Sequence, residues 1–391
     1  MLSVEEAISA VLEGAAPIGH EQAGLGELVG RIAAEDVTAR MTQPPFAASA
    51  MDGYAVRFKD MRVGAELRVI GEAPAGAPFN GTVAAGEAVR IFTGGAVPKG
   101  ADHVVIQEDV AREGETITIK EDQPRPRNIR AAGIDFKEGD VLAEKGMRLH
   151  DIHGAVFAAA NINKVSVYRR PKVAVFSNGD ELKEPGADLK PGEIINSNHY
   201  ALTAMISGWG GEAVYLGCAP DSEEAIRDYF RGGAEADVVI PVGGASVGDY
   251  DFVKSAFAKE GGETVFSKVA VRPGKPTWCG NMGKARVIGL PGNPASAIVT
   301  AALFVQPLVR RLAGEIWSAP FLKARLTAPV GANGGREAYL RAEEKDGAVA
   351  PASNQDSSLL FPFAKANALI RRPVNAPALK AGDEVECVRL R

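Results

Sequence analysis

Residues 172–217 decide the fold of this chain, and they read KVAVFSNGDELKEPGADLKPGEIINSNHYALTAMISGWGGEAVYLG. A short apolar run opens the segment, a stretch with helical texture follows, and a second apolar run closes it. The same alternation continues through DSEEAIRDYFRGG (221–233), DVVIPVGG (237–244) and ARVIGLPGNP (285–294). Apolar runs that alternate with helices are typical of a parallel sheet with helices on both faces. We therefore expect an α/β domain that begins near residue 171.

The segments on either side of this domain have a different texture. From about residue 67 to residue 142, short apolar or alternating runs are separated by Gly and Pro, which predicts a β-rich domain. Residues 149–162 then predict a helix. After residue 314 the strand texture returns, and it predicts a small β-barrel or sandwich. The chain is therefore expected to contain several domains, as its 391 residues also suggest.

Composition and charge narrow the class of protein. The formal net charge is -5, so the basic footprint of a nucleic-acid-binding protein is not visible. The three cysteines, Cys218, Cys279 and Cys387, form no CxxC pair, which argues against a disulfide framework or a zinc site. We expect reduced thiols and no nucleic-acid partner.

The N-terminus and the hydropathy pattern predict the location. Ser3 and Glu6 match a capping box in front of an amphipathic helix, and the basic start of a signal peptide is missing. The sequence contains no uninterrupted apolar stretch of about 18 residues, so we expect no membrane span. These observations predict a cytoplasmic protein.

Four polar loops each follow a predicted strand in the α/β region. They are SNGDEL (177–182), GGASVGDYD (243–251), RPGKP (272–276) and LPGNPAS (290–296). Ligands of open α/β sheets bind at the carboxyl ends of the strands, where such loops meet. The sequence therefore predicts a binding site at this edge of the sheet.

The residue types in these loops suit a phosphate-bearing ligand and a divalent metal. A glycine-rich turn before a helix can hold an anion with its backbone N–H groups, and Gly243, Gly244, Ser246 and Gly248 supply that turn. Hard oxygen ligands for Mg²⁺ come from Asp180, Glu181, Asp249 and Asp251. Arg272 and Lys275 can meet an oxyanion. Asn293, Pro294 and Ser296 begin a helix that is expected to run to Arg311.

Each of these signals has a plainer interpretation. A Gly-Gly pair after a strand is usually a turn, an Asp-Glu pair is usually solvated, and Asn293 can be only a helix cap. Asp221 is by position a residue at a helix N-terminus, and His199 is expected on a helix surface. The coincidence of four loops at one edge is what favours a site.

Six motifs, in order, carry a resemblance to a known family. They are SAMDGYAVR (49–57), FTGGAVPKGAD (92–102), SNGDEL, GGASVGDYD, RPGKP and LPGNPAS. Together they resemble the MoeA family, the molybdopterin molybdenumtransferases, which are related to the C-terminal domain of gephyrin. The resemblance covers essentially the whole chain.

The resemblance implies a multidomain α/β plus β architecture in four parts. These are an elongated helical part (1–41 and 147–170), an inserted β-rich domain (42–146), an α/β molybdopterin-binding-type domain with a parallel sheet (171–316) and a C-terminal β-barrel (317–391). It also implies a homodimer whose site lies between the α/β domain of one copy and the β-rich domain of the other.

The implied reaction uses molybdate and adenylylated molybdopterin, needs Mg²⁺ and releases AMP. The family's functional acids fall on Asp52, Asp135, Glu181, Asp221 and Asp251, and its hydroxyl falls on Thr93. Its substrate-binding positions fall on Arg272, Lys275, Pro291 and Pro294 and, with a looser match, on Arg341, Ser357 and Ser358.

The resemblance also suggests roles. Glu181 and Asp251, with Asp249 nearby, are expected to hold Mg²⁺, and Arg272 and Lys275 are expected to bind molybdate. The glycine-rich backbone is expected to bind the pterin phosphate, and Asp52 is expected to act from the second copy. The chain departs from the usual family pattern at Asn178, where Thr is common, but no acid or base is lost.

Two other functions stay open. The α/β fold also suits a molybdopterin adenylyltransferase-like nucleotide enzyme, and gephyrin-like domains also serve as scaffolds. The whole-chain match and the retained acids favour the transferase. A molybdopterin adenylyltransferase and cofactor-accepting molybdoenzymes are the partner proteins that this reaction implies.

Overall fold

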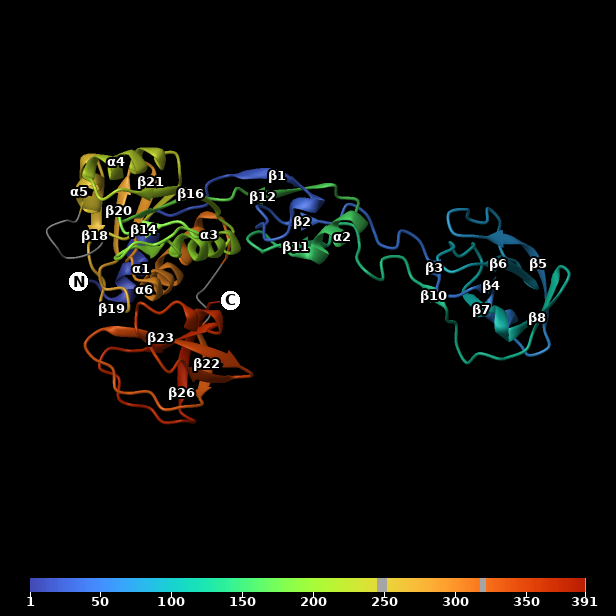
Figure 1. Cartoon of the computed structure of the whole chain (residues 1–391). Coiled ribbons are helices and arrows are strands. Elements are labelled where there is room, and N and C mark those ends of the chain that lie inside the picture. The colour runs from blue at the N-terminus through green and yellow to red at the C-terminus, as the bar shows by residue number, and fades with distance from the viewer. Residues whose placement is uncertain (245–251, 317–320, 391) are drawn as a thin grey trace.

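The computed structural model describes residues 1–244, 252–316 and 321–390, and the chain has an extended shape (Figure 1). An α/β domain and a β-barrel lie at one end, an elongated part leads away from them, and a β-rich domain forms the other end. The chain passes through the elongated part once on its way out and once on its way back. The β-rich domain is therefore an insertion.

The α/β domain is built on a six-stranded sheet in the order β16-β13-β17-β21-β20-β18. The strands are β13 Lys172–Asn178, β16 Glu212–Ala219, β17 Val238–Val242, β18 Glu263–Phe266, β20 Trp278–Met282 and β21 Ala285–Gly289. The first four in the sheet order are parallel, and β20 and β18 add an antiparallel edge. The predicted parallel sheet is confirmed for those four strands.

Helices cover both faces of this sheet. They are α3 Asn198–Gly208, α4 Glu223–Gly232, α5 Phe252–Lys259, α6 Pro294–Thr300 and α7 Gln306–Leu312. Because side chains alternate between the faces along a strand, Val173 packs in one core with Leu202 of α3. Phe176 packs in the other core with Phe230 of α4 and Phe257 of α5. This alternation is the physical basis of the three-layered domain.

The last helix of the domain is continuous and buried. A π-helical turn, Ala301–Val305, joins α6 to α7, so the helix runs from Pro294 to Leu312 with Asn293 at its N-cap, as predicted. Within the described residues it is the one helix long and apolar enough to cross a membrane, but 89% of its apolar window is buried. Its apolar composition is explained by packing in the core of this domain.

The N-terminal helix α1, Val4–Leu12, begins with the predicted capping box. Ser3 Oγ accepts from Glu6 N at 3.2 Å, and the Glu6 carboxylate accepts from Ser3 N at 2.8 Å. Val4 and Val11 are buried in the same core as Leu202, so α1 packs on the α/β domain. The sequence had grouped residues 1–41 with the elongated part, but this helix has its contacts elsewhere.

The elongated part consists of two short antiparallel sheets and one α-helix. The strands are β1 His20–Gly24 with β12 Lys164–Tyr168, and β2 Val37–Thr38 with β11 Val141–Ala143. The 3-10 turn η1, Leu25–Glu27, lies against the helix α2, Asp151–Ala159, which confirms the helix predicted there. Arg148 of this part pairs with Glu315 of the α/β domain at 2.6 Å, so an ion pair fixes the junction.

The β-rich domain is a six-stranded sheet in the order β7-β4-β6-β5-β9-β8. The strands are β4 Gly53–Val56, β5 Glu66–Ala73, β6 Glu87–Ile91, β7 His103–Ile106, β8 Val110–Glu113 and β9 Thr116–Ile119. A two-stranded neck of β3, Ala48–Ser49, and β10, Ile129–Arg130, joins it to the elongated part. The sheet places the loops before β4 and after β6 beside each other.

The C-terminal region is a closed five-stranded barrel. The strands are β22 Phe321–Leu326, β23 Glu337–Lys345, β24 Ala348–Pro351, β25 Ala368–Arg372 and β26 Glu384–Arg389. It closes because β23 pairs with both β24 and β25. The short strand β19, Val271–Arg272, pairs with β23 and not with the α/β sheet. The RPGKP loop therefore follows a strand of the barrel sheet, which corrects the expectation that all four loops follow strands of the α/β sheet.

Candidate functional site

A cleft of about 610 Å³ opens at the carboxyl ends of β13 and β17. Three of the four predicted loops and residues 194–198 contribute most of its described lining, Pro276 comes from the fourth loop, and Ser358 comes from the C-terminal region. The lining residues are Ser177, Asn178, Glu181, Leu182, Ile194, Ile195, Asn196, Ser197, Asn198, Val242, Gly243, Gly244, Pro276, Pro291, Gly292, Asn293, Pro294 and Ser358. The structure thus brings the loops together at the edge of the sheet where the sequence places the site.

The floor of the cleft is made of buried, uncharged polar side chains. Ser177, Asn178 and Asn196 are 1%, 8% and 3% exposed, and all three line the cleft. Ser177 Oγ donates to Asn196 Oδ1 at 3.0 Å, and Asn196 Nδ2 donates to the Tyr215 hydroxyl at 2.7 Å. The ring of His199 stacks on Tyr215 with 3.8 Å between the ring centroids.

The sequence reasoning missed this floor and placed His199 wrongly. His199 is buried rather than on a helix surface, and its burial lowers the pKa of the imidazole. The signal that was available is the run Asn196-Ser197-Asn198, since amide side chains are favoured where a loop enters a helix. That signal identifies a helix start but not a ligand site.

The predicted acids Glu181 and Asp221 lie together on one side of the cleft. Both line an adjoining hollow of about 420 Å³, with Asn178, Gly179, Gly244 and Phe252. Asn178 Nδ2 donates to Asp221 Oδ1 at 3.1 Å, and Asp221 N donates to Asp180 Oδ1 at 3.1 Å. The end of β13 and the end of β16 are thereby tied through these side chains.

The remaining predicted residues of this region cannot be placed. Ser246, Gly248, Asp249 and Asp251 lie outside the described residues. In the described part of the chain, no group of three or more His, Cys, Asp and Glu side chains is arranged to hold a metal ion. The metal site predicted from Glu181, Asp249 and Asp251 therefore stays a prediction.

Two glycines are required where β17 runs into the cleft. Gly243 and Gly244 have φ of +105° and +60°, which side chains other than glycine rarely adopt. A Cβ at Gly244 would lie 2.3 Å from Val253 Cγ2, and one at Gly243 would lie 2.8 Å from the Asn178 carbonyl oxygen. The backbone at Gly243 and Gly244 therefore lies closer to Asn178 than the backbone of a residue with a side chain could lie.

A second, basic hollow of about 420 Å³ adjoins the cleft and shares Pro276 with it. Arg272 and Lys275 line it, together with the buried Ser296, and both basic side chains are exposed. Within the described residues, neither Arg272 nor Lys275 has a side-chain hydrogen bond or ion pair. Two unpaired cations beside a cleft suit an oxyanion.

The position of the RPGKP loop depends on Gly274. Its φ is +112°, and a Cβ there would lie 2.2 Å from Thr300 Cγ2 of α6. The loop thus packs closely on the last residue of α6, and Arg272 and Lys275 line a hollow together with Ser296 of the same helix.

A loop of the C-terminal barrel contacts the start of α6. Ala295 N donates to the Ser357 carbonyl at 3.0 Å, and Asn293 Nδ2 donates to Ser357 Oγ at 3.3 Å. Arg341 is 2% exposed, and its guanidinium donates to the Leu359 carbonyl at 2.8 Å and the Asp356 carbonyl at 2.9 Å. Arg341 thus holds the loop that carries Ser357, and because it also lines the basic hollow its contact with substrate stays a prediction.

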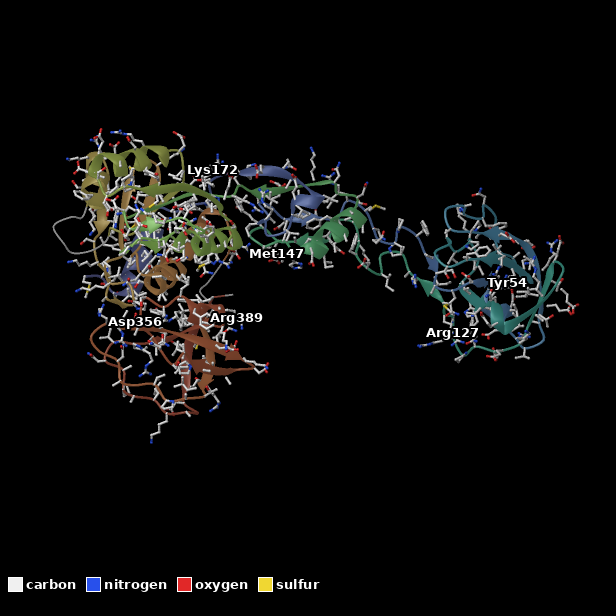
Figure 2. The ribbon with its side chains drawn as sticks, viewed as in Figure 1. Tyr54, Arg127, Met147, Lys172, Asp356 and Arg389 are labelled. Carbon is white, nitrogen blue, oxygen red and sulfur yellow. The ribbon has the colours of Figure 1, made fainter. Side chains whose placement is uncertain are left out.

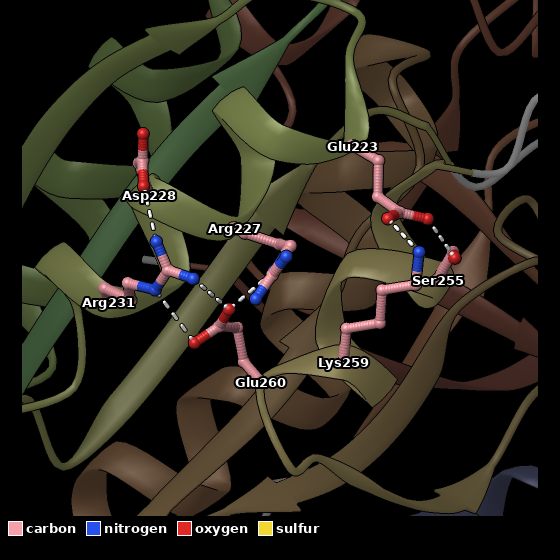
Figure 3. Close-up of polar contacts among 7 residues, drawn as sticks. All are labelled: Glu223, Arg227, Asp228, Arg231, Ser255, Lys259 and Glu260. Atoms are coloured by element: carbon pink, nitrogen blue, oxygen red, sulfur yellow. Dashed lines mark hydrogen bonds and ion pairs between the residues drawn. The ribbon is translucent and has the colours of Figure 1, made fainter.

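The helices behind two of the site loops are clamped to each other by ion pairs (Figure 3). Glu223, two residues after Asp221, bonds to Ser255 and Lys259 of α5. Glu260 pairs with Arg227 at 2.6 Å and with Arg231 at 2.8 Å. The neighbouring Lys259 lowers the pKa of Glu223. The clamp ties the start of α4, beside Asp221, to α5.

Asp52 and Thr93 form a second polar centre on the β-rich domain. Thr93 donates to Asp52 Oδ1 from its backbone N at 2.7 Å and from its hydroxyl at 2.9 Å, and these bonds lower the pKa of Asp52. Arg90 Nη1 donates to the Gly53 carbonyl at 3.1 Å, which holds the same loop. Asp135, whose N donates to the Gln43 carbonyl at 3.2 Å, lies in the chain that leads back from this domain.

Within one chain these residues are far from the cleft. Tyr54, next to the Asp52 loop, marks the β-rich end of the molecule, whereas Lys172 and Asp356 mark the end that carries the cleft (Figure 2). The elongated part separates the two ends (Figure 1). The structure thus groups Glu181, Asp221 and the basic loop, and does not bring Asp52, Thr93 or Asp135 to them.

Models of known protein families match three consecutive regions of the chain. Residues 2–161 match the MoeA N-terminal region (domain I and II), residues 174–311 a probable molybdopterin binding domain, and residues 323–390 the MoeA C-terminal region (domain IV). A molybdopterin molybdenumtransferase of Haemophilus influenzae is 41% identical over 325 residues, which cover 82% of this chain and 80% of the relative. The chain belongs to the MoeA family.

Two further MoeA-family proteins extend the likeness to the full length. The molybdopterin molybdenumtransferase of a Nostoc species is 36% identical, and the match covers 92% of this chain and 86% of the relative. The crystal structure of a molybdopterin biosynthesis MoeA protein from Pyrococcus horikosii has a TM-score of 0.86 and 34% identity. That match covers 100% of this chain and 99% of the other. The elongated part and the inserted domain are thus features that the chain has in common with a solved family structure.

Proposed function

We propose that this chain is a molybdopterin molybdenumtransferase, which inserts molybdenum from molybdate into adenylylated molybdopterin and releases AMP. The observation that carries the proposal is the juxtaposition of two hollows of different character. An amide-lined cleft with acids on one side shares Pro276 with a hollow lined by Arg272 and Lys275, whose side chains have no partner in the described chain. The reaction needs that pair of environments, one for an organic substrate and one for an oxyanion.

Molybdate binding is assigned to the basic hollow. Arg272 and Lys275 are exposed cations without partners in the described chain, and Ser296 adds a buried hydroxyl at the N-terminus of the long helix. Charge-assisted hydrogen bonds from such groups hold tetrahedral oxyanions well. Because Pro276 borders both hollows, an oxyanion here lies beside the organic substrate.

Mg²⁺ is assigned to the acidic side of the cleft. Glu181 and Asp221 line one hollow and supply carboxylate oxygens, the ligand type that Mg²⁺ prefers. Asp249 and Asp251 are proposed to complete the set. When bound, the ion neutralises charge on the adenylate phosphate during its hydrolysis. Glu181 and Asp221 would hold this ion, and the ion would supply the positive charge that the phosphate end of the substrate needs.

A homodimer is part of the proposal, because the two polar centres of one chain are separated. Asp52 is exposed, preformed by two hydrogen bonds from Thr93, and carried at the end of a long arm-like part. In a twofold dimer the β-rich domain of each copy can reach the cleft of the other. Asp52, Thr93 and Asp135 then complete a site that Glu181 and Asp221 begin.

The free cysteines and the proposed reaction favour a location for the protein and imply its partner proteins. Cys218, Cys279 and Cys387 are free thiols, as a reducing compartment allows, and we place the protein in the cytoplasm. Its adenylylated substrate has to come from a molybdopterin adenylyltransferase, and its product has to pass to molybdoenzymes.

The direct test is a single-turnover assay with purified protein, adenylylated molybdopterin, Mg²⁺ and molybdate. We expect AMP release that depends on molybdate and on Mg²⁺. Glu181→Ala should lose it and Arg272→Ala should need more molybdate for it, while Glu235→Ala, at a 95% exposed side chain, serves as a matched control. Consumption of ATP with formation of adenylylated molybdopterin would instead identify an adenylyltransferase.

A further inference from the structure

The nitrogen and the oxygen of the Asn178 side-chain amide have different surroundings. Its Nδ2 donates to Asp221 Oδ1 at 3.1 Å, and its Oδ1 is buried without a hydrogen-bond partner among the described residues. A carboxylate can only accept, so the amide atom that faces Asp221 is the nitrogen and the other is the oxygen. The chemistry of Asp221 therefore fixes which atom of Asn178 is left unpaired.

An unpaired buried oxygen is unusual in a folded protein. Most buried polar atoms have partners, and leaving one without a partner costs stability. Asn178 is 8% exposed and lies where the cleft meets the acidic hollow, since it lines both. The unpaired acceptor is therefore placed in a ligand site and not in a sealed core.

Two glycines of the cleft lining lie directly beside Oδ1. A Cβ at Gly243 or at Gly244 would each lie 3.1 Å from Asn178 Oδ1, so any side chain there would press on the oxygen. Both glycines line the cleft. The lining of the cleft beside this buried oxygen is therefore backbone and not side chain.

The chemistry of an amide oxygen selects its partner. Phosphate and molybdate oxygens are acceptors and gain nothing from it, whereas an N–H of a ligand does. A metal ion shared with the Asp221 carboxylate does not suit Oδ1, because the amide turns its nitrogen toward that carboxylate. A neutral ring with an amino group or ring N–H is the matching class.

We propose that Asn178 recognises the ligand of the cleft by accepting an N–H from its planar heterocycle through Oδ1, while Nδ2 holds Asp221. This inference rests on the proposed function, which supplies two such heterocycles, a pterin and an adenine. It makes Asn178 a specificity-determining residue that links substrate binding to the position of an acid. Ser177 and Asn196, bonded to each other, form the neutral floor beside it.

The test measures binding of three separate probes to the full-length protein: molybdopterin under anaerobic conditions, AMP, and molybdate. Asn178→Leu keeps the side-chain size but removes the acceptor. We expect binding of one heterocyclic probe to weaken about tenfold, because its N–H loses its acceptor in the protein. Molybdate binding is expected to stay unchanged, since Arg272 and Lys275 are untouched.

Two comparison variants separate recognition from a structural effect. Asp221→Ala removes the partner of Nδ2 but keeps Oδ1, so it should weaken heterocycle binding less than Asn178→Leu. Asn281→Leu replaces an exposed asparagine of β20 in the same domain and should change nothing. Thermal unfolding of each ligand-free variant shows whether the domain itself is disturbed.

Each outcome of the binding test either supports or overturns the inference. A loss seen with molybdopterin supports the inference with the pterin as donor, and a loss seen with AMP supports it with the adenine as donor. Unchanged binding of both, a parallel loss of molybdate, or only a higher Mg²⁺ requirement overturns it. If the wild-type protein binds neither heterocycle, the proposed function itself fails.

Discussion

Sharing of one site between two copies can be tested by mixing two inactive variants. Asp52→Ala removes the carboxylate of the β-rich domain, and Glu181→Ala removes one on the acidic side of the cleft. Asp52 accepts two hydrogen bonds from Thr93 and sits at the far end of the molecule from Glu181, so neither change disturbs the other centre. Each variant alone is expected to lose activity on the order of 100-fold.

If the site is shared, the activity that the mixture recovers can be calculated. After subunit exchange at equal amounts, half of the dimers carry one copy of each variant. In such a dimer one site combines both intact centres and the other combines both defects. The recovered molybdate-dependent AMP release should therefore approach about a quarter of the wild-type value.

The assay needs proof of exchange as well as activity. Two different affinity tags on the variants allow the mixed dimer to be purified, and it should carry about half of the wild-type activity. If mixed dimers form but stay as inactive as the single variants, each site lies within one chain and the reasoning is refuted. A protein that stays monomeric at working concentration while releasing AMP at the full rate also refutes it.

Three further predictions concern single residues. Arg272→Ala and Lys275→Ala should each raise the KM for molybdate by about 10-fold to 100-fold, with molybdopterin binding intact, because a charge-assisted contact is lost. An unchanged KM in steady-state kinetics would show that molybdate binds at another place. Gly244→Ala should destabilise the protein by about 1–3 kcal/mol in denaturant unfolding, since its Cβ would lie 2.3 Å from Val253 Cγ2 at a φ of +60°. Gly261→Ala is the control, because Gly261 has a φ of +79° and no close neighbour. A Gly244→Ala variant as stable as the wild-type protein would contradict the clash. Thr93→Val should raise the lowered pKa of Asp52 in a carboxyl NMR titration, because the hydroxyl bond favours the ionised form. That contribution to stability is present above the unfolded-state pKa and is lost as the pH falls through the lower folded-state pKa; an Asp52 pKa that stays low in Thr93→Val would assign the effect to the backbone N–H alone.

Local patterns in the sequence determined the type and order of most elements. Alternating apolar runs and helical stretches predicted the α/β domain, and the Ser3–Glu6 capping box and Asn293-Pro294 predicted where helices begin. These predictions succeeded because hydrophobic periodicity and capping depend on residues a few positions apart. The loops SNGDEL and LPGNPAS were placed correctly because parallel strands end at one edge.

Long-range packing decided what the sequence could not. The pairing of β19 with the barrel and the docking of α1 on the α/β core each join segments far apart in the chain. The bond between Asn178 and Asp221, 43 positions apart, is of the same kind. No local pattern encodes such contacts, because their energy depends on which surfaces meet after folding. The distance between Asp52 and the cleft likewise appears only once the elongated part holds the two ends apart.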